Sequence, residues 1–167
     1  MNPVSGVVTA AARWILGGLF LWMGLSKALD PIGFLKLVHA YDFLTSPILL
    51  NLIAGILPWF EVFCGLLLLF GVAVRGAALV TVAMLVPFTL LVLRRAIVLH
   101  AGGHLPFCAI KFDCGCGAGE VFICRKLAEN TALTLISLGL VVLRQHPGSF
   151  RPTLFGRKLP PAAETGA

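Results

Sequence analysis

Residues 48–74 read ILLNLIAGILPWFEVFCGLLLLFGVAV, an apolar run that contains a single charged side chain, Glu61. A helix needs about 20 mainly apolar residues to cross the hydrocarbon core of a bilayer. The run shows no period of two, so it does not fit the alternating strands of a membrane β-barrel. These residues therefore predict a membrane-spanning helix.

The composition of the whole chain agrees with this reading. Of its 167 residues, 59% are hydrophobic and 12% are charged, whereas a soluble domain is about 45–50% apolar and about 25% charged. This excludes a water-soluble globule, a disordered chain and a fibrous repeat. The net charge of +6 forms no basic stripe interleaved with aromatic residues, so it indicates loops facing anionic lipid rather than nucleic acid.

Three further stretches extend the pattern, at residues 7–29, 76–99 and 127–143. We expect an all-α membrane protein, a four-transmembrane-helix bundle that forms a single domain over residues 1–145, followed by a mobile tail over residues 146–167. No small-residue cleavage site follows the first stretch, so we interpret it as an uncleaved span.

The connection between the first two spans predicts a short amphipathic helix in the membrane interface. Asp30-Pro31 favours a helix start. Lys36, His39 and Asp42 lie among apolar residues. An ordered loop is the alternative.

Four of the five cysteines lie between the third and fourth spans, in the cysteine loop of residues 100–126. The glycine-rich segment DCGCGAG, residues 113–119, holds Cys114 and Cys116 one residue apart. Only a tight, strained ring could join them, and strained disulfides are the labile, oxidising ones. We predict that Cys114 and Cys116 form a redox pair, and that Cys108 and Cys124 form a bridge or act as resolving thiols.

Two other readings of this loop stay open. The four cysteines could form purely structural disulfides, for which three connectivities exist. Thiolates and imidazoles could also bind zinc or copper, although the spacing matches no standard zinc motif. The candidate metal ligands are His100, His104, Cys108, Cys114 and Cys116.

The cysteines also orient the chain. Lys and Arg are divided almost equally between the two sides, so the positive-inside rule does not decide. Disulfides persist on the oxidising side of a membrane. We therefore expect a multi-pass protein of the bacterial inner membrane, with both termini cytoplasmic and the cysteine loop periplasmic.

Glu61 lies near the middle of its span, and an acid in lipid predicts a functional site. It is either protonated or paired with Lys27, Arg94 or Arg95. Its role is either to fix helix packing or to act as a proton relay or a contact for a quinone head. Cys64, three residues on, shares its helix face and is expected to be a small buried residue rather than a thiol in use.

Glycines recur along the first three spans and predict close helix approach. They are Gly17, Gly18, Gly24, Gly55, Gly65, Gly71 and Gly76.

The order of these motifs resembles the DoxX-like membrane proteins, and more specifically the MauE branch, over roughly residues 10–143. The matching elements are Gly24-Leu25-Ser26-Lys27, Asp30-Pro31, Phe34, Tyr41, Leu57-Pro58-Trp59-Phe60-Glu61, Gly65, Gly71, Cys114-Gly115-Cys116-Gly117, Arg125 and Asn130.

The resemblance implies a four-helix membrane protein that works beside a periplasmic thioredoxin-like partner. MauE is associated with the maturation of methylamine dehydrogenase, whereas DoxX relatives are linked to quinone-reducing complexes. Our hypothesis is an inner-membrane thiol–disulfide protein whose Cys114 and Cys116 exchange electrons or disulfides with that partner during maturation of a redox enzyme. The alternatives are a non-catalytic subunit that anchors or stabilises a respiratory quinone oxidoreductase complex, and a metal-binding membrane protein. Whether the protein is an enzyme is not decided by the sequence.

Overall fold

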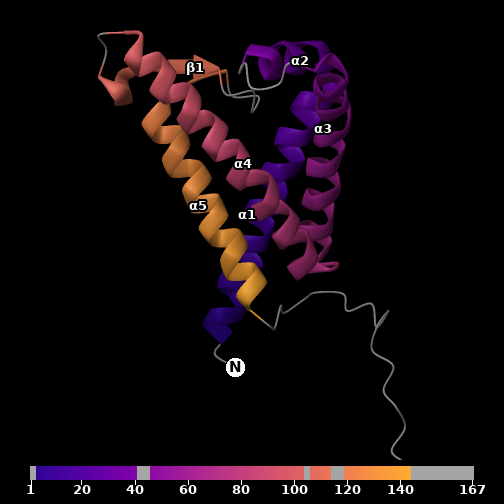
Figure 1. The fold of residues 1–167 in the computed structure, drawn as a ribbon. Coiled ribbons are helices and arrows are strands. Elements are labelled where there is room, and N and C mark those ends of the chain that lie inside the picture. Colours follow the sequence, from indigo (N-terminus) through magenta and orange to yellow (C-terminus); the bar gives the residue numbers. More distant parts are fainter. Residues whose placement is uncertain (1–2, 41–45, 104–105, 114–118, 144–167) are drawn as a thin grey trace, which may run out of the picture.

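The computed structural model describes residues 3–40, 46–103, 106–113 and 119–143. These residues form five α-helices and one two-stranded hairpin (Figure 1). In chain order they are α1 (Pro3–Leu29), α2 (Pro31–Ala40), α3 (Pro47–Phe70), α4 (Val74–Ala101), the 3-10 turn η1 (Phe107–Ala109), β1 (Lys111–Asp113), β2 (Glu120–Phe122) and α5 (Ile123–Val142). The expected tail at residues 146–167 lies outside the described residues.

Three of these helices are long and apolar enough to cross a membrane: α1 from Gly6 onward, α3 and α4. The expectation of four spanning helices is therefore not confirmed. Helix α5 is expected from the run at residues 127–143, but it begins earlier, at Ile123. That earlier start adds Arg125 and Lys126 to Glu129 within the helix, so α5 as a whole is more polar than the run that predicted it.

Helix α3 ends at Phe70, four residues before the end of the span predicted at 48–74, because Gly71 terminates it. Gly71 adopts a left-handed conformation with φ 72°, and its N–H points to the carbonyls of Leu67 and Leu68. This is the usual role of glycine after a helix. Helix α4 then begins at Val74, so Arg75, the residue between the expected spans 48–74 and 76–99, lies in the first turn of α4.

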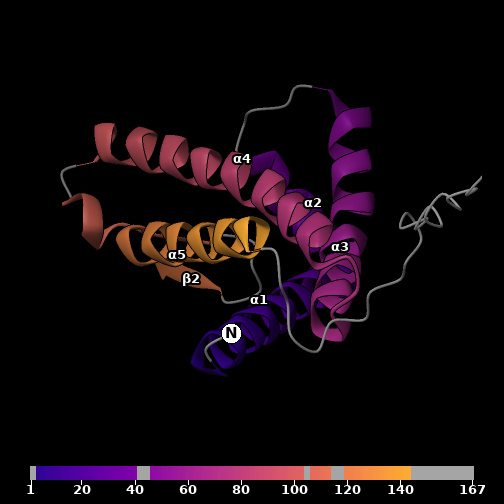
Figure 2. The same ribbon diagram turned by 90° about the horizontal axis from the view of Figure 1, so that it is seen from below.

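The helices are arranged as two pairs, α1 with α3 and α4 with α5 (Figures 1 and 2). The pairs meet at the end that holds the α3–α4 turn, where Leu16, Leu68, Ala78 and Leu140 share one buried cluster. Toward the other end α4 leans away from α3, and this is where α2 and the hairpin lie (Figure 1). The bundle is therefore tightly closed at one end and more open at the other.

Glycine permits the close contact between α1 and α3. A Cβ atom built on Gly24 would lie 2.7 Å from the Pro58 carbonyl oxygen and from the Val62 nitrogen. One built on Gly65 would lie 2.7 Å from the Leu21 nitrogen. By contrast, a Cβ at Gly18 or at Gly55, Gly76 and Gly139 would meet nothing within 4 Å. Only some of the glycines in the predicted set therefore serve helix contact.

The segment between the first two spanning helices forms the expected helix, α2. The Gly33 N–H donates to Asp30 Oδ1 at 2.9 Å, so the aspartate caps the helix start ahead of Pro31. Phe34 and Val38 are buried against α3. Helix α2 thus covers the open end of the α1–α3 pair.

The hairpin corrects the all-α expectation. Strands β1 and β2 pair antiparallel, with Lys111 opposite Phe122 and Asp113 opposite Glu120. Strands of three residues are too short to show an alternating pattern in the sequence. Ile110 and Ile123, at the foot of the hairpin, are buried against Ala96 of α4.

Large apolar side chains cover the outward faces of the helices. Trp22 on α1, Phe63 on α3 and Leu90 on α4 are all more than half exposed. An apolar surface of this extent fits contact with lipid rather than with water.

Candidate functional site

Lys27 and Glu61 form a buried ion pair between α1 and α3. Lys27 Nζ donates to Glu61 Oε1 at 2.5 Å and to Oε2 at 2.7 Å. The two side chains are only 5% and 8% exposed. Of the three basic partners that the sequence offers Glu61, the structure has Lys27. Arg94, by comparison, is exposed on α4.

The glycine contact places this pair. Gly24 lies one turn before Lys27, and Pro58 lies one turn before Glu61. Because the α1 backbone approaches α3 closely at Gly24, the two following turns bring the ammonium and the carboxylate together. Removing either partner would leave the other charge buried and unpaired, which costs several kcal/mol.

A cavity of about 280 Å³ lies beside the ion pair. Lys27 and Glu61 are the charged residues in its wall, and the remaining wall is apolar. Its wall is formed by residues of α1, α2, α3 and α4. The apolar wall comprises Phe20, Met23, Phe34, Val38, Ile53, Leu57, Ala83, Met84, Leu85, Pro87, Phe88 and Leu91.

Two aromatic rings face the ammonium group. Lys27 Nζ lies 5.4 Å from the centre of the Phe34 ring and 6.0 Å from that of Phe88. These distances are within the range of cation–π attraction. Phe34 comes from α2 and Phe88 from α4, so two different helices each place a ring near the same lysine.

Two buried polar residues on α5 were missed by the sequence analysis as site residues. Lys126 is 4% exposed, lies 3.9 Å from Glu129 and interacts electrostatically with Lys27 and Glu61. Asn130, one turn on, is fully buried, and neither its amide oxygen nor its amide nitrogen has a hydrogen-bond partner among the described residues. Lys126 stands at the end of the cysteine loop, where polar residues are ordinary, and Asn130 was marked only as an element of the family resemblance.

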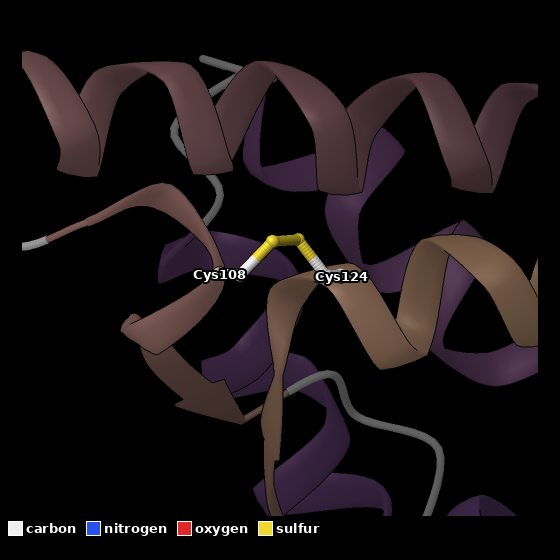
Figure 3. The surroundings of a disulfide bond; sticks show 2 residues. All are labelled: Cys108 and Cys124. Atoms are coloured by element: carbon white, nitrogen blue, oxygen red, sulfur yellow. A yellow bond between two sulfur atoms is a disulfide. The ribbon is translucent and has the colours of Figure 1, made fainter.

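A disulfide closes the base of the hairpin (Figure 3). It joins Cys108 in η1 to Cys124 in the first turn of α5. The Ile123 N–H also donates to the Ile110 carbonyl at 3.1 Å. Bonded in this way, Cys108 has no thiolate to offer a metal ion.

The described strand ends at Asp113 and Gly119 border a hollow that Lys27 also lines. Asp113 and Gly119, which flank the segment with Cys114 and Cys116, line a hollow together with Lys27, Asp30 and four other residues. Lys27 also lines the main cavity. One lysine therefore borders both the cavity and the base of the cysteine-bearing segment.

The other predicted site residues are only partly among the described residues. Cys114, Cys116 and His104 fall outside the described residues. Cys64 is a free, buried cysteine on α3, and His100 packs edge-on against Phe107 with ring centres 5.8 Å apart. Within residues 3–40, 46–103, 106–113 and 119–143, no group of three or more His, Cys, Asp or Glu residues is placed to hold a metal.

Comparison with known proteins gives one match. The family model described as "Methylamine utilisation protein MauE" matches residues 5–143. No curated protein sequence and no solved structure matches the chain significantly.

Proposed function

Because the chain belongs to the MauE family, we propose that this multi-pass membrane protein is a thiol–disulfide protein of the bacterial inner membrane. Its Cys114 and Cys116 exchange electrons or disulfides with a periplasmic thioredoxin-like partner. The exchange serves the maturation of a redox enzyme, and the printed description of the family points to methylamine utilisation.

The observation that carries this proposal is the Cys108–Cys124 disulfide beneath the hairpin. Disulfides persist in oxidising compartments, which supports a periplasmic position for this end of the molecule. Cys108 and Cys124 already satisfy one another, so the pair Cys114 and Cys116 is left for exchange. Pairing of Asp113 with Glu120 brings the two ends of the cysteine-bearing segment together on a braced hairpin.

We further infer that α5 is a fourth span. Its 20 residues give a length of about 30 Å, which matches the hydrocarbon core of a bilayer. It packs along α4, and its outward residues Leu135, Leu138 and Val142 are apolar and exposed. Its charged residues stand in the first two turns, next to the hairpin. Four spans would put both termini on one side, and a periplasmic disulfide would make that side cytoplasmic and put α2 at the periplasmic interface.

Trapping of a mixed disulfide tests the thiol proposal. In cells that express the full chain, Cys116→Ser or Cys114→Ser leaves one thiol of the pair, and we expect one of these variants to accumulate a covalent adduct. Non-reducing electrophoresis detects the adduct, and mass spectrometry identifies the partner. Cys64→Ser is the matched control and is expected to trap nothing.

A different outcome would sink the proposal. If neither variant forms an adduct, and alkylation finds Cys114 and Cys116 in the same state before and after dithiothreitol, the pair does not exchange. Co-purification with a large oxidoreductase complex, together with inert cysteines, would identify a non-catalytic anchoring subunit instead. Metal recovered in proportion to the protein would identify a metal-binding protein.

A further inference from the structure

The cavity beside Lys27 and Glu61 has the character of a ligand site. We infer that it binds a membrane quinone, with a ring carbonyl accepting a hydrogen bond from Lys27 and the apolar tail passing between α3 and α4 toward the lipid. The choice of a redox-active ligand rests on the proposed thiol function. The presence of the cavity and of its polar wall is independent of that proposal.

The dimensions suit a head group followed by a tail. Pockets for drug-sized molecules measure about 300–1,000 Å³, and this cavity of about 280 Å³ is at the lower limit. It therefore holds a single ring with the first part of a chain. Its apolar wall continues onto α4 through Ala83, Pro87 and Leu91, next to outward-facing residues such as Leu90.

The polar wall favours an uncharged head. Lys27 and Glu61 neutralise one another, and Lys126 nearby is balanced by Glu129. An anionic phosphate placed here would have no net positive charge to meet, and its burial would be costly. A neutral carbonyl needs only a donor.

Lys27 has such a donor. Its ammonium carries three N–H groups, and the two oxygens of Glu61 accept from it. A bound carbonyl can take the remaining N–H without breaking the ion pair.

The aromatic residues favour a flat head. Phe34 of α2 and Phe88 of α4 both approach Lys27 Nζ. A planar ring that reaches the ammonium lies beside these phenyl rings, where offset stacking is favourable. Pro87 adds a further polar feature, because proline cannot donate to the carbonyl four residues earlier, at Ala83. That carbonyl, in the cavity wall, can accept from the hydroxyl of a quinol.

The neighbouring hairpin distinguishes a quinone from an ordinary lipid. Lys27 borders both the cavity and the hollow formed with Asp113 and Gly119. A dithiol that becomes a disulfide releases two electrons and two protons, and a quinone takes up the same number to become a quinol. A quinone in this cavity would thus meet the lysine that also borders Asp113 and Gly119, the residues flanking the segment whose thiols would supply its electrons.

The test is a direct binding measurement on the full chain. The protein is reconstituted in phosphatidylcholine nanodiscs free of quinone, and decylubiquinone is titrated by calorimetry. We expect saturable binding of one quinone per chain. Decanol, which has a similar tail without the ring, is the matched probe and is expected not to saturate.

Two variants locate the site. Ala83→Phe fills the cavity without touching the ion pair, and we expect its Kd for decylubiquinone to rise at least tenfold. Val86→Phe, exposed on the same helix but outside the cavity wall, is its control. The double variant Lys27→Met with Glu61→Met removes the donor without leaving a lone charge, and we expect a loss of about tenfold to a hundredfold.

The following results would overturn the inference: no saturable binding, equal affinity of the Ala83→Phe and Val86→Phe proteins, or displacement of the quinone by equimolar phosphatidylglycerol. The last would identify a phospholipid site. The outcome is separable from the thiol proposal, because disulfide trapping does not depend on quinone binding. Loss of trapping with quinone binding intact would refute the proposed function and leave the ligand site.

Discussion

At the scale of single residues, the buried ion pair distinguishes this chain from a plain apolar bundle. Lys27 and Glu61 are both below one-tenth exposed and meet through two hydrogen bonds. Such a pair contributes little net stability compared with apolar residues of the same volume, yet breaking it is costly. Its presence in the wall of a cavity is therefore better explained by a ligand than by packing.

The ion pair makes a prediction about stability. Lys27→Met or Glu61→Gln alone should lower the free energy of unfolding by about 3–5 kcal/mol, because one charge stays buried without its partner. The double variant Lys27→Met with Glu61→Met should recover most of that loss. Unfolding by SDS in mixed micelles measures all three.

The exposed pair of Arg125 and Glu129, with side chains 75% and 43% exposed, provides the control. Arg125→Ala should change the free energy of unfolding by about 0–1 kcal/mol. If the Lys27 and Glu61 single variants were equally mild, the pair would not be buried as described.

Sequence reasoning reached this pair but not its surroundings. A lone carboxylate in an apolar run identifies Glu61. Only a few cations lie near the ends of the neighbouring spans, where they could pair with it. Lys126 gave no such signal, because it ends a cysteine-rich connection in which charged residues are expected, and Asn130 was marked only through the family resemblance. Their burial depends on how α5 packs, which is a tertiary property.

At the scale of elements, the contact between α1 and α3 sets the geometry of the site. Gly24 allows the two backbones to touch one turn from Lys27, and Gly65 repeats the contact farther along. In lipid, helices associate through close packing rather than through the hydrophobic effect, so small residues at the contact matter more than in a soluble bundle.

This contact can be tested with one methyl group. Gly24→Ala places a Cβ 2.7 Å from two backbone atoms of α3, so the helices must separate, and we expect a loss of about 1–3 kcal/mol. Gly18→Ala, on the same helix but facing open space, should be neutral or stabilising by up to about 1 kcal/mol. SDS titration compares the two variants. Equal stability of both would argue against the close approach.

Prediction at this scale was uneven for physical reasons. The helix start at Asp30-Pro31 could be read directly, since a capping carboxylate and a proline act locally. The end of α3 was placed too late, because Val72 and Ala73 continue the apolar run while Gly71 turns the backbone. The hairpin was missed, because it depends on contacts of Ile110 and Ile123 with α4 rather than on its own pattern.

At the scale of the whole molecule, the chain forms two helix pairs that share a core at one end only. Three helices have the length and hydropathy of spans, and α5 packs beside one of them. The composition alone predicted a helical membrane protein, but not the pairing. Pairing follows from which glycines and small side chains meet, and a single sequence does not reveal that.

The fourth span predicts the topology of the chain. Alkaline phosphatase, which is active only in the periplasm, should be active when fused after Gly103 and inactive when fused after Leu143. A green fluorescent protein fused at the same points should show the reverse. Active phosphatase at both points would mean that α5 does not cross the membrane.

The uneven closure of the bundle has a mechanical consequence. At the narrow end the buried cluster around Leu16 and Leu140 joins the two pairs, and the Arg75 Nε donation to the Val141 carbonyl at 2.9 Å holds α4 to α5. A rotation of one helix pair against the other would pivot at this end. A small rotation of α4 and α5 about it moves their far ends by several times more, so it changes the width between Phe34 and Phe88 while leaving the narrow end intact. The lateral pressure of the bilayer would act on the same rotation, so the width of the cavity would depend on the surrounding lipid.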